Sequence, residues 1–329
     1  MKYAILGTGQ VALRHALAFS KINNLSLVGF LEKDIKKSKF FSKKFNTKKF
    51  KNLDDLLKQN IDFIIISLPH NQRINPIIKC INYKVNLLIE KPLCLNKNEL
   101  NILLPYIKNR NVKIAISFVH RFRKEVMQTK KLLINNLIGK IRIISENMHS
   151  YKNPLLPKWI DNKKISGGGV LMYNAIHSID KLIYLTQSKI VSVTAKKNNI
   201  NKKLNVEDNI IVILKFKNGV IASLFSTFTP YKINPTWQTL IFGEKGLINL
   251  NIRKGLFVTS QNQTKEYNYS EYYNRKGLNY NFYLQAISFV NSLKKKKKPF
   301  INEKDGINSI LVVDAIYQSI KLNKTINLN

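Results

Sequence analysis

The feature that most constrains the fold is a turn near the start of the chain, in AILGTGQVALRHAL. Gly7, Gly9 and Ala12 have the G-x-G-x-x-A spacing between a strand-like run and a helix-like run. Gly7 allows a tight turn, Gly9 lets the backbone approach a pyrophosphate, and Ala12 lets the helix pack closely. Free amides at the helix N-terminus then face the phosphates, so the pattern predicts a dinucleotide-binding unit. The residues expected at the cofactor here are Gly7, Thr8, Gly9, Gln10, Val11 and Ala12.

An acidic residue ends the second strand-like run, at the position expected for a ribose-binding side chain. Glu32 would accept hydrogen bonds from the adenosine ribose hydroxyls and repel a 2′-phosphate, which favours NAD over NADP. A solvated carboxylate at the end of a strand is the alternative. Lysines follow closely and could accommodate a phosphate, so NADP stays an alternative cofactor. Those lysines are Lys33, Lys36 and Lys37.

Short apolar runs alternate with helix-like runs through the first third of the chain. Strands that alternate with helices, several of them continuously apolar, are typical of a parallel sheet covered on both faces. Asn96 and Glu99 have the spacing of a capping box, which predicts a helix start there. We therefore expect an α/β Rossmann domain, a doubly wound parallel sheet, over residues 1–120. The expected strands are KYAIL, LSLVGF, DFIIISL, VNLLIE and VKIAISF.

The pattern changes after a helix-like run near residues 121–137. Several strand-like runs then follow almost in succession, starting with KIRIISENMHS. Asn218 and Gly219 lie between alternating apolar runs, which is a strong hairpin signal because both can take positive φ. GEKG repeats this theme. We expect a C-terminal α+β domain over residues 121–329, with a predominantly antiparallel, open-faced sheet and helices near 280–293 and 307–322. Whether the C-terminal helix packs back on the first domain is left open.

Two further segments carry residues suited to chemistry. LIEKPLCLN places Glu90, Lys91 and Pro92 at the carboxyl end of a parallel strand, where the ligand crevice opens. ISGGGVLMYNAIHSID carries Tyr173 and His177 four residues apart, so both point to one side of a regular helix. An imidazole titrates near neutral pH and suits a general base for a hydroxyl proton. The alternative is a glycine turn followed by a packed helix with a buried core histidine.

In their order along the chain, these motifs resemble those of the Gfo/Idh/MocA oxidoreductases, which include glucose–fructose oxidoreductase and inositol dehydrogenase. The matching segments span almost the whole chain: GTGQVA, EKP, SGGGVLMYNAIHSID, the NG hairpin and GEKG. The resemblance implies an enzyme that binds NAD or NADP and oxidises or reduces a carbinol of a sugar, cyclitol or nucleotide-sugar. It also implies a homo-oligomer, a dimer or tetramer, formed through the open face of the second sheet.

The resemblance also suggests roles for individual residues. Lys91 is similar to the family lysine that hydrogen-bonds the reacting hydroxyl, and His177 is similar to the catalytic histidine. Many members have Asp where this chain has Tyr173, and Asn174 cannot simply replace it because one residue turns a helical side chain by about 100°. Tyr173 is then either part of the proton relay or a substrate hydrogen-bonding group. The missing Asp leaves a non-catalytic dinucleotide-binding scaffold or sensor as the alternative function.

The expected site includes further contacts to cofactor and substrate. Arg121 stands where the family often has a substrate-binding arginine, although an interdomain salt bridge is the alternative. Trp159 either lines the nicotinamide end of the cleft or packs in the core. Asp180 is expected to orient His177 or to face solvent. The remaining cofactor contacts are Ser67, Leu68, Pro69, Glu90 and Lys91, and the substrate contacts are Arg121, Trp159 and Asn174.

The formal net charge of +36 raises nucleic acid or an anionic membrane as partners. However, only eight of the 55 basic residues are Arg, whose planar fork is favoured in specific phosphate and base recognition. Lysine recurs along the whole chain, including the run KKKKK, so we expect a solvated surface and no specific nucleic-acid site. Cys80 and Cys94 lack CxxC spacing and clustered histidines, and no apolar run reaches membrane-spanning length. We expect core thiols, no metal site, no membrane partner and a cytoplasmic protein.

Overall fold

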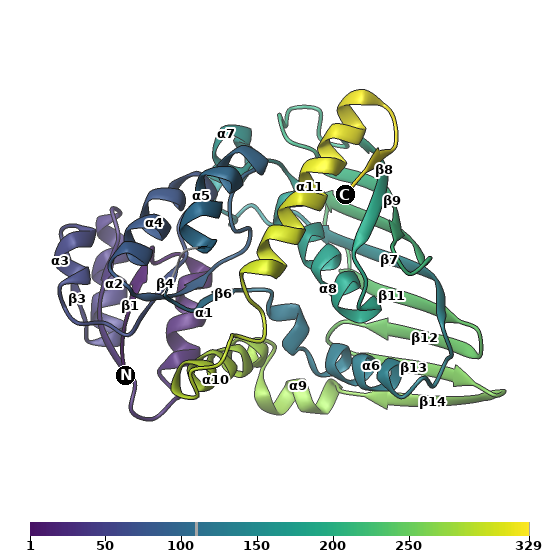
Figure 1. The fold of residues 1–329 in the computed structure, drawn as a ribbon, viewed down its shortest axis with the longest axis horizontal. Coiled ribbons are helices and arrows are strands. Elements are labelled where there is room, and N and C mark those ends of the chain that lie inside the picture. The colour runs from purple at the N-terminus through teal and green to yellow at the C-terminus, as the bar shows by residue number, and fades with distance from the viewer. Residues whose placement is uncertain (109–110, 329) are drawn as a thin grey trace. The chain divides into compact units, whose positions relative to one another are not determined.

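A computed structural model describes residues 1–108 and 111–328, and its contacts divide the chain into two units (Figure 1). The first unit contains Met1–Val119 and Asn279–Ile310, and the second contains His120–Leu278 and Leu311–Asn329. The second unit is therefore not the continuous segment 121–329 that we expected. Residues 279–310 return to the first unit because their apolar side chains pack into its core.

The first unit contains the predicted parallel sheet. Its six strands are in the order β3-β2-β1-β4-β5-β6, and every neighbouring pair is parallel. The fold class expected for this part of the chain is confirmed. The strands are β1 (Lys2–Leu6), β2 (Ser26–Leu31), β3 (Lys48–Lys49), β4 (Phe63–Ile66), β5 (Asn86–Ile89) and β6 (Ile114–Ile116). The helices are α1 (Gln10–Phe19), α2 (Ile35–Phe45), α3 (Leu53–Leu57), α4 (Ile74–Asn82), α5 (Lys97–Lys108) and α10 (Tyr280–Lys294).

Helix α10 completes the hydrophobic core of the first unit by packing against α1. The ring of Phe289 meets Phe63 of β4 edge-on, with 5.3 Å between ring centroids. The ring of Phe282 meets the imidazole of His15 in the same way at 5.0 Å. Both α10 phenylalanines are buried in one cluster with the strands of the sheet. This burial is the physical reason that residues 279–310 group with the N-terminal segment.

The second unit is built around a mixed sheet of nine strands, in the order β14-β13-β12-β11-β7-β10-β9-β8-β15. Only β7 and β10 pair in parallel; the other neighbours are antiparallel, as predicted. The strands are β7 (Ile141–Tyr151), β8 (Ile190–Asn198), β9 (Asn209–Phe216), β10 (Ile221–Thr229), β11 (Thr236–Gly243), β12 (Gly246–Asn251), β13 (Gly255–Ser260), β14 (Gln263–Asn268) and β15 (Ile326–Asn327). The NG and GEKG segments form the expected hairpins, and Gly219 has a φ of +90°.

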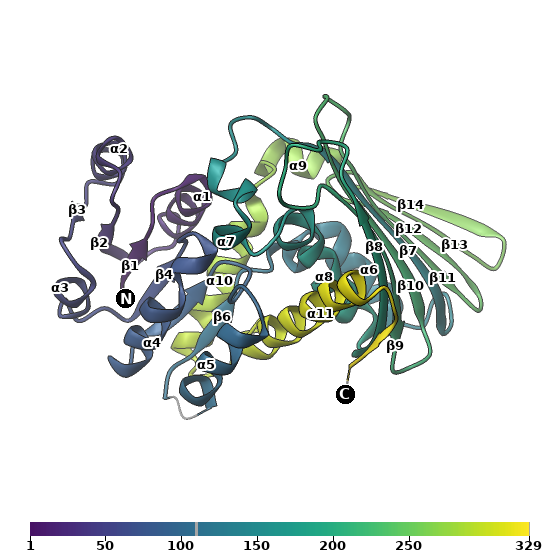
Figure 2. The same ribbon diagram turned by 90° about the horizontal axis from the view of Figure 1, so that it is seen from above.

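Helices cover one face of this sheet and leave the other bare (Figure 2). The covering helices of the unit are α6 (Lys124–Ile134), α8 (Ile176–Thr186) and the second half of α11 (Glu303–Leu322), while α7 (Lys163–Ser166) and α9 (Ser270–Lys276) lie in its connections. The opposite face, called the open face below, carries exposed apolar side chains on β9, β10, β7, β11 and β13. They are Ile143, Ile211, Ile213, Ile221, Phe225, Phe242 and Phe257.

Two helices differ from their expected ranges. The run near residues 121–137 forms a 3₁₀ turn and then the shorter helix α6, which ends at Ile134. Helix α11 begins at Glu303, four residues before the expected start, because Asn302 caps it. The Oδ1 atom of Asn302 accepts from the backbone amide of Lys304 at 3.1 Å. The backbone amide of Asn302 donates to the carboxylate of Asp305 at 2.8 Å. These two hydrogen bonds form a cap similar to a capping box, which was not predicted from the sequence.

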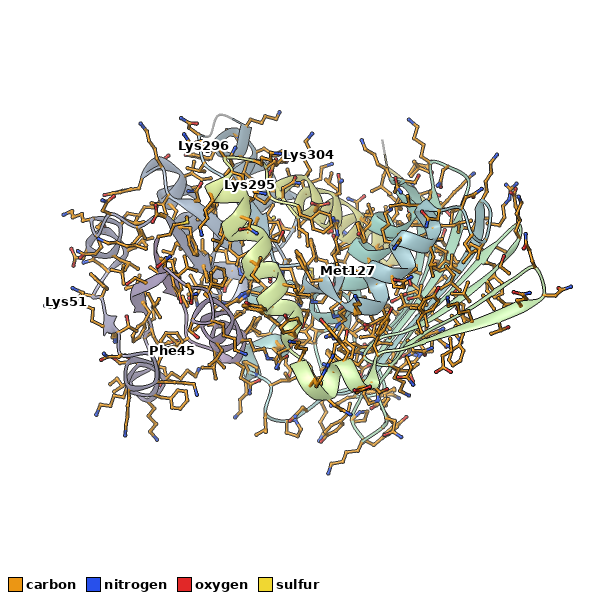
Figure 3. All side chains as sticks on the ribbon, turned by 90° about the horizontal axis from the view of Figure 1, so that it is seen from below. Phe45, Lys51, Met127, Lys295, Lys296 and Lys304 are labelled. Atoms are coloured by element: carbon orange, nitrogen blue, oxygen red, sulfur yellow. The ribbon has the colours of Figure 1, made fainter. Side chains whose placement is uncertain are left out.

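The lysine run after α10 forms an exposed loop, as expected. Figure 3 shows Lys295 and Lys296 at this end of α10, with Lys304 close by at the start of the next helix. Lys298 forms an ion pair with Glu303 at 2.9 Å. Among the described helices, none combines the length and the apolar character needed to cross a membrane.

Candidate active site

The nucleotide turn between β1 and α1 has the backbone that the glycine pattern predicts. Gly7 has a φ of +83°, and a Cβ added there would lie 2.7 Å from the carbonyl oxygen of Ser67. Gly9 is the N-cap of α1, and a Cβ on it would meet no described heavy atom within 4 Å. Open space therefore lies beside the backbone at the start of α1. This space and the helix N-terminus fit the pyrophosphate of a dinucleotide.

Glu32 lies beside this turn and is held in its ionised form. Its carboxylate accepts from the amide of Thr8 at 2.9 Å, from the Thr8 hydroxyl at 2.7 Å and from the amide of Asp34 at 2.9 Å. Partial burial raises the pKa of Glu32, but the hydrogen bonds from Asp34 and Thr8 outweigh it and the pKa is lowered. The three lysines considered above are exposed. Lys37 lies 3.7 Å from the carboxylate of Asp34.

The loop after β5 holds Lys91 half-buried. Desolvation lowers the pKa of Lys91 to about 8, although the neighbouring Glu90 opposes the shift. The carboxylate of Glu90 is itself bonded to His15 Nε2 at 2.7 Å. The peptide bond between Lys91 and Pro92 is cis. Lys91 thus has a perturbed pKa, as groups at functional sites often do, and it is still mostly protonated at neutral pH.

Arg73 fixes this loop, a role that the sequence did not reveal. Its guanidinium is 3% exposed and donates to the carbonyl oxygens of Glu90, Pro92 and Leu68. Burial lowers the pKa of Arg73 to about 10, with Glu90 acting in the opposite direction. One side chain therefore joins the ends of β4 and β5, and it brings the 67–69 and 90–92 segments together at the same edge of the sheet as the nucleotide turn.

Two of the three glycines before α8 are required for close packing. A Cβ on Gly169 would lie 1.8 Å from the carbonyl oxygen of Glu207, and one on Gly168 would lie 1.7 Å from the hydroxyl of Tyr317. The buried carboxylate of Glu207 accepts from the amides of Gly169 at 2.9 Å and Leu171 at 3.2 Å. It also accepts from the Tyr317 hydroxyl at 2.9 Å. Glu207 thus organises the turn that leads into the candidate catalytic helix.

The segment after the glycines is not the regular helix that we expected. Residues Leu171–Ala175 form a π turn, in which the amide of Ile176 bonds to the carbonyl of Leu171 five residues earlier. Such turns wind more loosely than an α-helix and are frequent at functional sites. On a regular helix, Tyr173 and His177 would point to the same side, and Asn174 would point about 100° away from Tyr173. Because the winding here is looser, neither direction follows from the spacing alone.

His177 is 9% exposed and stacks on a second imidazole. Its ring lies parallel to that of His120, with 4.4 Å between centroids and 10° between planes. The ring of Trp237, in β11, also contacts the His120 ring, with 5.4 Å between centroids. His120 therefore limits how the His177 ring can turn. This contact could not be predicted from the sequence, because the two histidines are 57 residues apart.

The other expected site residues of the second unit are found in three different settings. The ring of Tyr173 lies 5.7 Å from that of Phe228, and the Asn174 amide donates to the Ser150 hydroxyl at 3.2 Å. Trp159 is half-buried in the 3₁₀ turn Lys158–Asp161. Tyr173 and Asn174 therefore lie side by side just before α8, each with a partner in a strand of the sheet.

Arg121 makes a buried ion pair with Asp180. Its Nε and Nη2 atoms donate to the two carboxylate oxygens at 2.9 and 2.6 Å, and both side chains are almost fully buried. Asp180 therefore does not face solvent. The pair joins two segments of the second unit, which makes it different from the interdomain salt bridge that we considered. It anchors α8 three residues after His177.

Two family models cover nearly the whole chain. The model described as the NAD-binding Rossmann fold of an oxidoreductase family matches residues 1–118. The model of the C-terminal alpha/beta domain of the same family matches residues 130–328. The chain belongs to the Gfo/Idh/MocA oxidoreductases. NAD is therefore the cofactor that the first unit of this Gfo/Idh/MocA chain binds, and the space before Gly9 is consistent with it.

Named relatives within the Gfo/Idh/MocA family are dehydrogenases. Glucose-6-phosphate 3-dehydrogenase of Bacillus subtilis is 30% identical over 240 residues, which is 69% of this chain and 67% of that protein. Myo-inositol 2-dehydrogenase of Thermotoga maritima is 22% identical, with 100% of this chain and 98% of that protein covered. The solved structure of levoglucosan dehydrogenase with NADH and levoglucosan superimposes with a TM-score of 0.90 at 19% identity, covering 99% of both chains. That likeness confirms the Gfo/Idh/MocA fold.

Proposed function

We propose that this chain is an NAD-dependent dehydrogenase that acts on a ring carbinol of a sugar or cyclitol. Relatives named for glucose 6-phosphate, myo-inositol and glucosides support this substrate class. The observation that carries the assignment to this chain is that each unit supplies one largely enclosed basic group suited to proton transfer. They are Lys91, with its lowered pKa, and the stacked His177.

In this proposal the protein residues handle the proton and the developing charge. When bound, the nicotinamide ring accepts or supplies the hydride. His177 takes the hydroxyl proton during oxidation and returns it during reduction. Lys91 stabilises the negative charge that develops on the reacting oxygen. A pKa of about 8 leaves Lys91 mostly protonated at neutral pH, so it remains a cation for this task.

The first experiment is a titration of the protein with NADH and, separately, with NADPH, followed by a screen of sugars and cyclitols with the preferred cofactor. We expect selective NADH binding and turnover of at least one polyol. NADH binding without turnover of any polyol would favour the non-catalytic scaffold, because this chain has Tyr173 where many family members have Asp. No binding of either cofactor at millimolar concentration would contradict the proposal.

Glu32→Gln should weaken the preference for NADH. A hydrogen bond to a charged group contributes about 1.5–3 kcal/mol, so we expect NADH affinity to fall about tenfold or more while NADPH affinity changes little. Quenching of tryptophan fluorescence measures both affinities. Asp34→Asn is the matched control, because it removes a carboxylate two residues away and keeps a side chain that can cap α2. Equal effects of the two variants would assign the change to charge alone.

Tyr173→Phe tests whether the hydroxyl takes part in the reaction, since it keeps the ring against Phe228. We propose that the hydroxyl contributes one hydrogen bond to the relay or the substrate, so kcat/KM should fall about tenfold. A loss in kcat would assign the hydroxyl to the proton relay, and a rise in KM alone would assign it to substrate binding. Kinetics equal to those of the unmodified enzyme would exclude both roles.

We also propose that the open face joins two copies of the chain. Five of its exposed apolar residues lie opposite one another on neighbouring strands, because Phe225 pairs with Ile211, and Ile221 and Phe242 both pair with Ile143. Large exposed apolar patches mark interaction surfaces, and burying this one against its own copy removes it from water. Sedimentation should show a dimer or larger oligomer that dissociates when Phe225 and Ile213 are both changed to Asp. Ile134→Asp, at an exposed position on α6, should leave the oligomer intact.

A reducing compartment such as the cytoplasm fits the two cysteines. Cys80 and Cys94 are both free and buried, and burial raises the pKa of each thiol to about 12. Such thiols are poorly reactive and do not form a structural disulfide. We propose a cytoplasmic enzyme on this ground, and a thiol-alkylation assay on the folded protein should find both side chains protected.

A further inference from the structure

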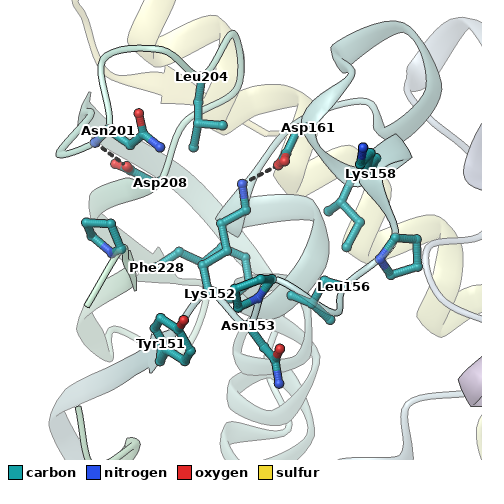
Figure 4. Close-up of a pocket in the computed structure, with 14 residues that line it drawn as sticks. Tyr151, Lys152, Asn153, Leu156, Lys158, Asp161, Asn201, Leu204, Asp208 and Phe228 are labelled. Atoms are coloured by element: carbon teal, nitrogen blue, oxygen red, sulfur yellow. Dashed lines mark hydrogen bonds and ion pairs between the residues drawn. The ribbon is translucent and has the colours of Figure 1, made fainter. Parts of the chain in front are cut away.

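A cavity of about 250 Å³ lies wholly within the second unit (Figure 4). Its lining comes from the 151–161 segment, from the 201–208 loop and from Phe228 and Pro230 at the end of β10. We call it the loop cavity. Pockets that hold a whole small ligand are about 300–1,000 Å³. The loop cavity is slightly smaller, so it suits one part of a ligand rather than all of it.

The loop cavity adjoins the residues around the start of α8. Phe228 lines the cavity and also contacts the ring of Tyr173, 5.7 Å between centroids. Tyr151 lines it as well, and the preceding Ser150 accepts a hydrogen bond from Asn174. Tyr173 is four residues before His177 in the same segment. Phe228 therefore touches both the cavity and Tyr173.

Charges around the loop cavity are balanced. Lys152 forms an ion pair with Asp161, drawn as a dashed line in Figure 4. The carboxylate of Asp208 accepts from the amides of Ile200 at 2.9 Å and Asn201 at 2.8 Å. With Lys158, two lysines and two aspartates line the cavity. A phosphate or carboxylate would need an excess of cations, whereas neutral hydroxyls can bond to both members of an ion pair.

Apolar groups lie next to these polar ones. Leu156, Leu204 and the Phe228 ring line the same space as Lys152, and Figure 4 shows Leu204 pointing toward Lys152 from the loop opposite. A site with apolar walls and a few fixed donors and acceptors recognises a ligand that has both kinds of surface. A pyranose ring is such a ligand, because its C–H groups are apolar and its hydroxyls both donate and accept.

We propose that the loop cavity binds a neutral sugar ring that is joined by a glycosidic bond to the ring carrying the reacting carbinol. The preferred substrate is then a glycoside or disaccharide rather than a free or phosphorylated monosaccharide. This inference rests on the proposed dehydrogenase function. It goes further by assigning a site and a substrate class to residues outside the proton-transfer groups.

The test compares glucose, glucose 6-phosphate, maltose and cellobiose with NAD-loaded enzyme and with two variants. Leu204→Trp fills the cavity, and Ile200→Trp adds the same side chain to an exposed position of the same loop that does not line it. We expect at least one disaccharide to exceed glucose in kcat/KM by about tenfold or more. Leu204→Trp should reduce the ratio of kcat/KM for that disaccharide to kcat/KM for glucose at least tenfold. Ile200→Trp should leave this ratio and the turnover of glucose unchanged.

Calorimetric titration of the NADH complex with the same sugars tests the cavity without turnover. The inference is supported if disaccharides bind and if Leu204→Trp weakens that binding while Ile200→Trp does not. If no sugar is oxidised in that case, the proposed enzyme function fails but the binding site stands. Disaccharides that bind no more tightly than glucose would overturn it. A preference for glucose 6-phosphate that is lost in Leu204→Trp would also overturn it, because the cavity would then bind an anion.

Discussion

His177→Ala should lower kcat by about 10²- to 10⁴-fold while NADH affinity stays within about twofold of the unmodified enzyme. A positioned general base contributes a factor of this size to a proton transfer, and His177 belongs to a different unit from the nucleotide turn. Lys91→Ala should cause a loss of about 10²- to 10³-fold, since it removes the cation that we propose stabilises the developing oxyanion. Steady-state kinetics on the best polyol, together with NADH titration, measure both quantities.

His149→Ala is the matched control for this prediction. His149 is another histidine of the second unit, and its ring contacts Phe225 on the open face, 4.5 Å between centroids. The His149→Ala variant should keep near-normal turnover per folded subunit. Near-normal turnover in His177→Ala or Lys91→Ala would contradict the roles proposed for these residues. A similar loss in His149→Ala would point instead to a general effect on the fold of the second unit.

Lys181→Met should destabilise the protein by about 3–5 kcal/mol. Lys181 and Glu146 form an ion pair at 2.9 Å, and their side chains are 1% and 0% exposed. Removing one partner leaves the other charge buried without compensation, which costs about this much free energy. Ser178 and Thr239 also donate to Glu146, at 2.6 Å each, but neither carries a positive charge. Urea unfolding followed by circular dichroism measures the loss.

The double variant Lys181→Met with Glu146→Gln separates charge from packing. Replacing both members of a buried ion pair by neutral side chains of similar size is often close to neutral. The double variant should therefore recover most of the stability lost in the single one. A double variant as unstable as Lys181→Met would show that the ammonium mainly serves the hydrogen bond to Thr239, which has a length of 2.8 Å.

Features that depend on neighbouring residues could be predicted from the sequence. The nucleotide turn follows from Gly7 and Gly9, and the hairpin at Gly219 follows from one dipeptide. Asn96 accepts from the Glu99 amide at 3.0 Å, as the capping-box pattern implied, although Glu99 reaches back to the amide of Leu95. In each case the physical cause is a backbone preference or a hydrogen bond within a few residues.

Contacts between distant parts of the chain could not be predicted. Glu207 caps a glycine turn almost forty residues earlier, and Arg73 bonds to the loop after β5. Nothing in the local pattern around either residue marks it as buried. The stacking of His120 on His177 likewise depends on the folded second unit. The π turn before α8 was missed because periodicity separates it poorly from an ordinary helix.

The return of residues 279–310 to the first unit has a consequence for how the protein is made. The N-terminal segment leaves the ribosome long before α10, whose Phe282 and Phe289 belong to its core. Until α10 is synthesised, the surface of α1 that it covers stays exposed and open to wrong partners. Helix α11 then passes from one unit to the other between Ile310 and Leu311. A nascent chain halted after residue 278 would thus lack part of each unit, so chaperone demand during translation should persist until α10 and α11 have been synthesised.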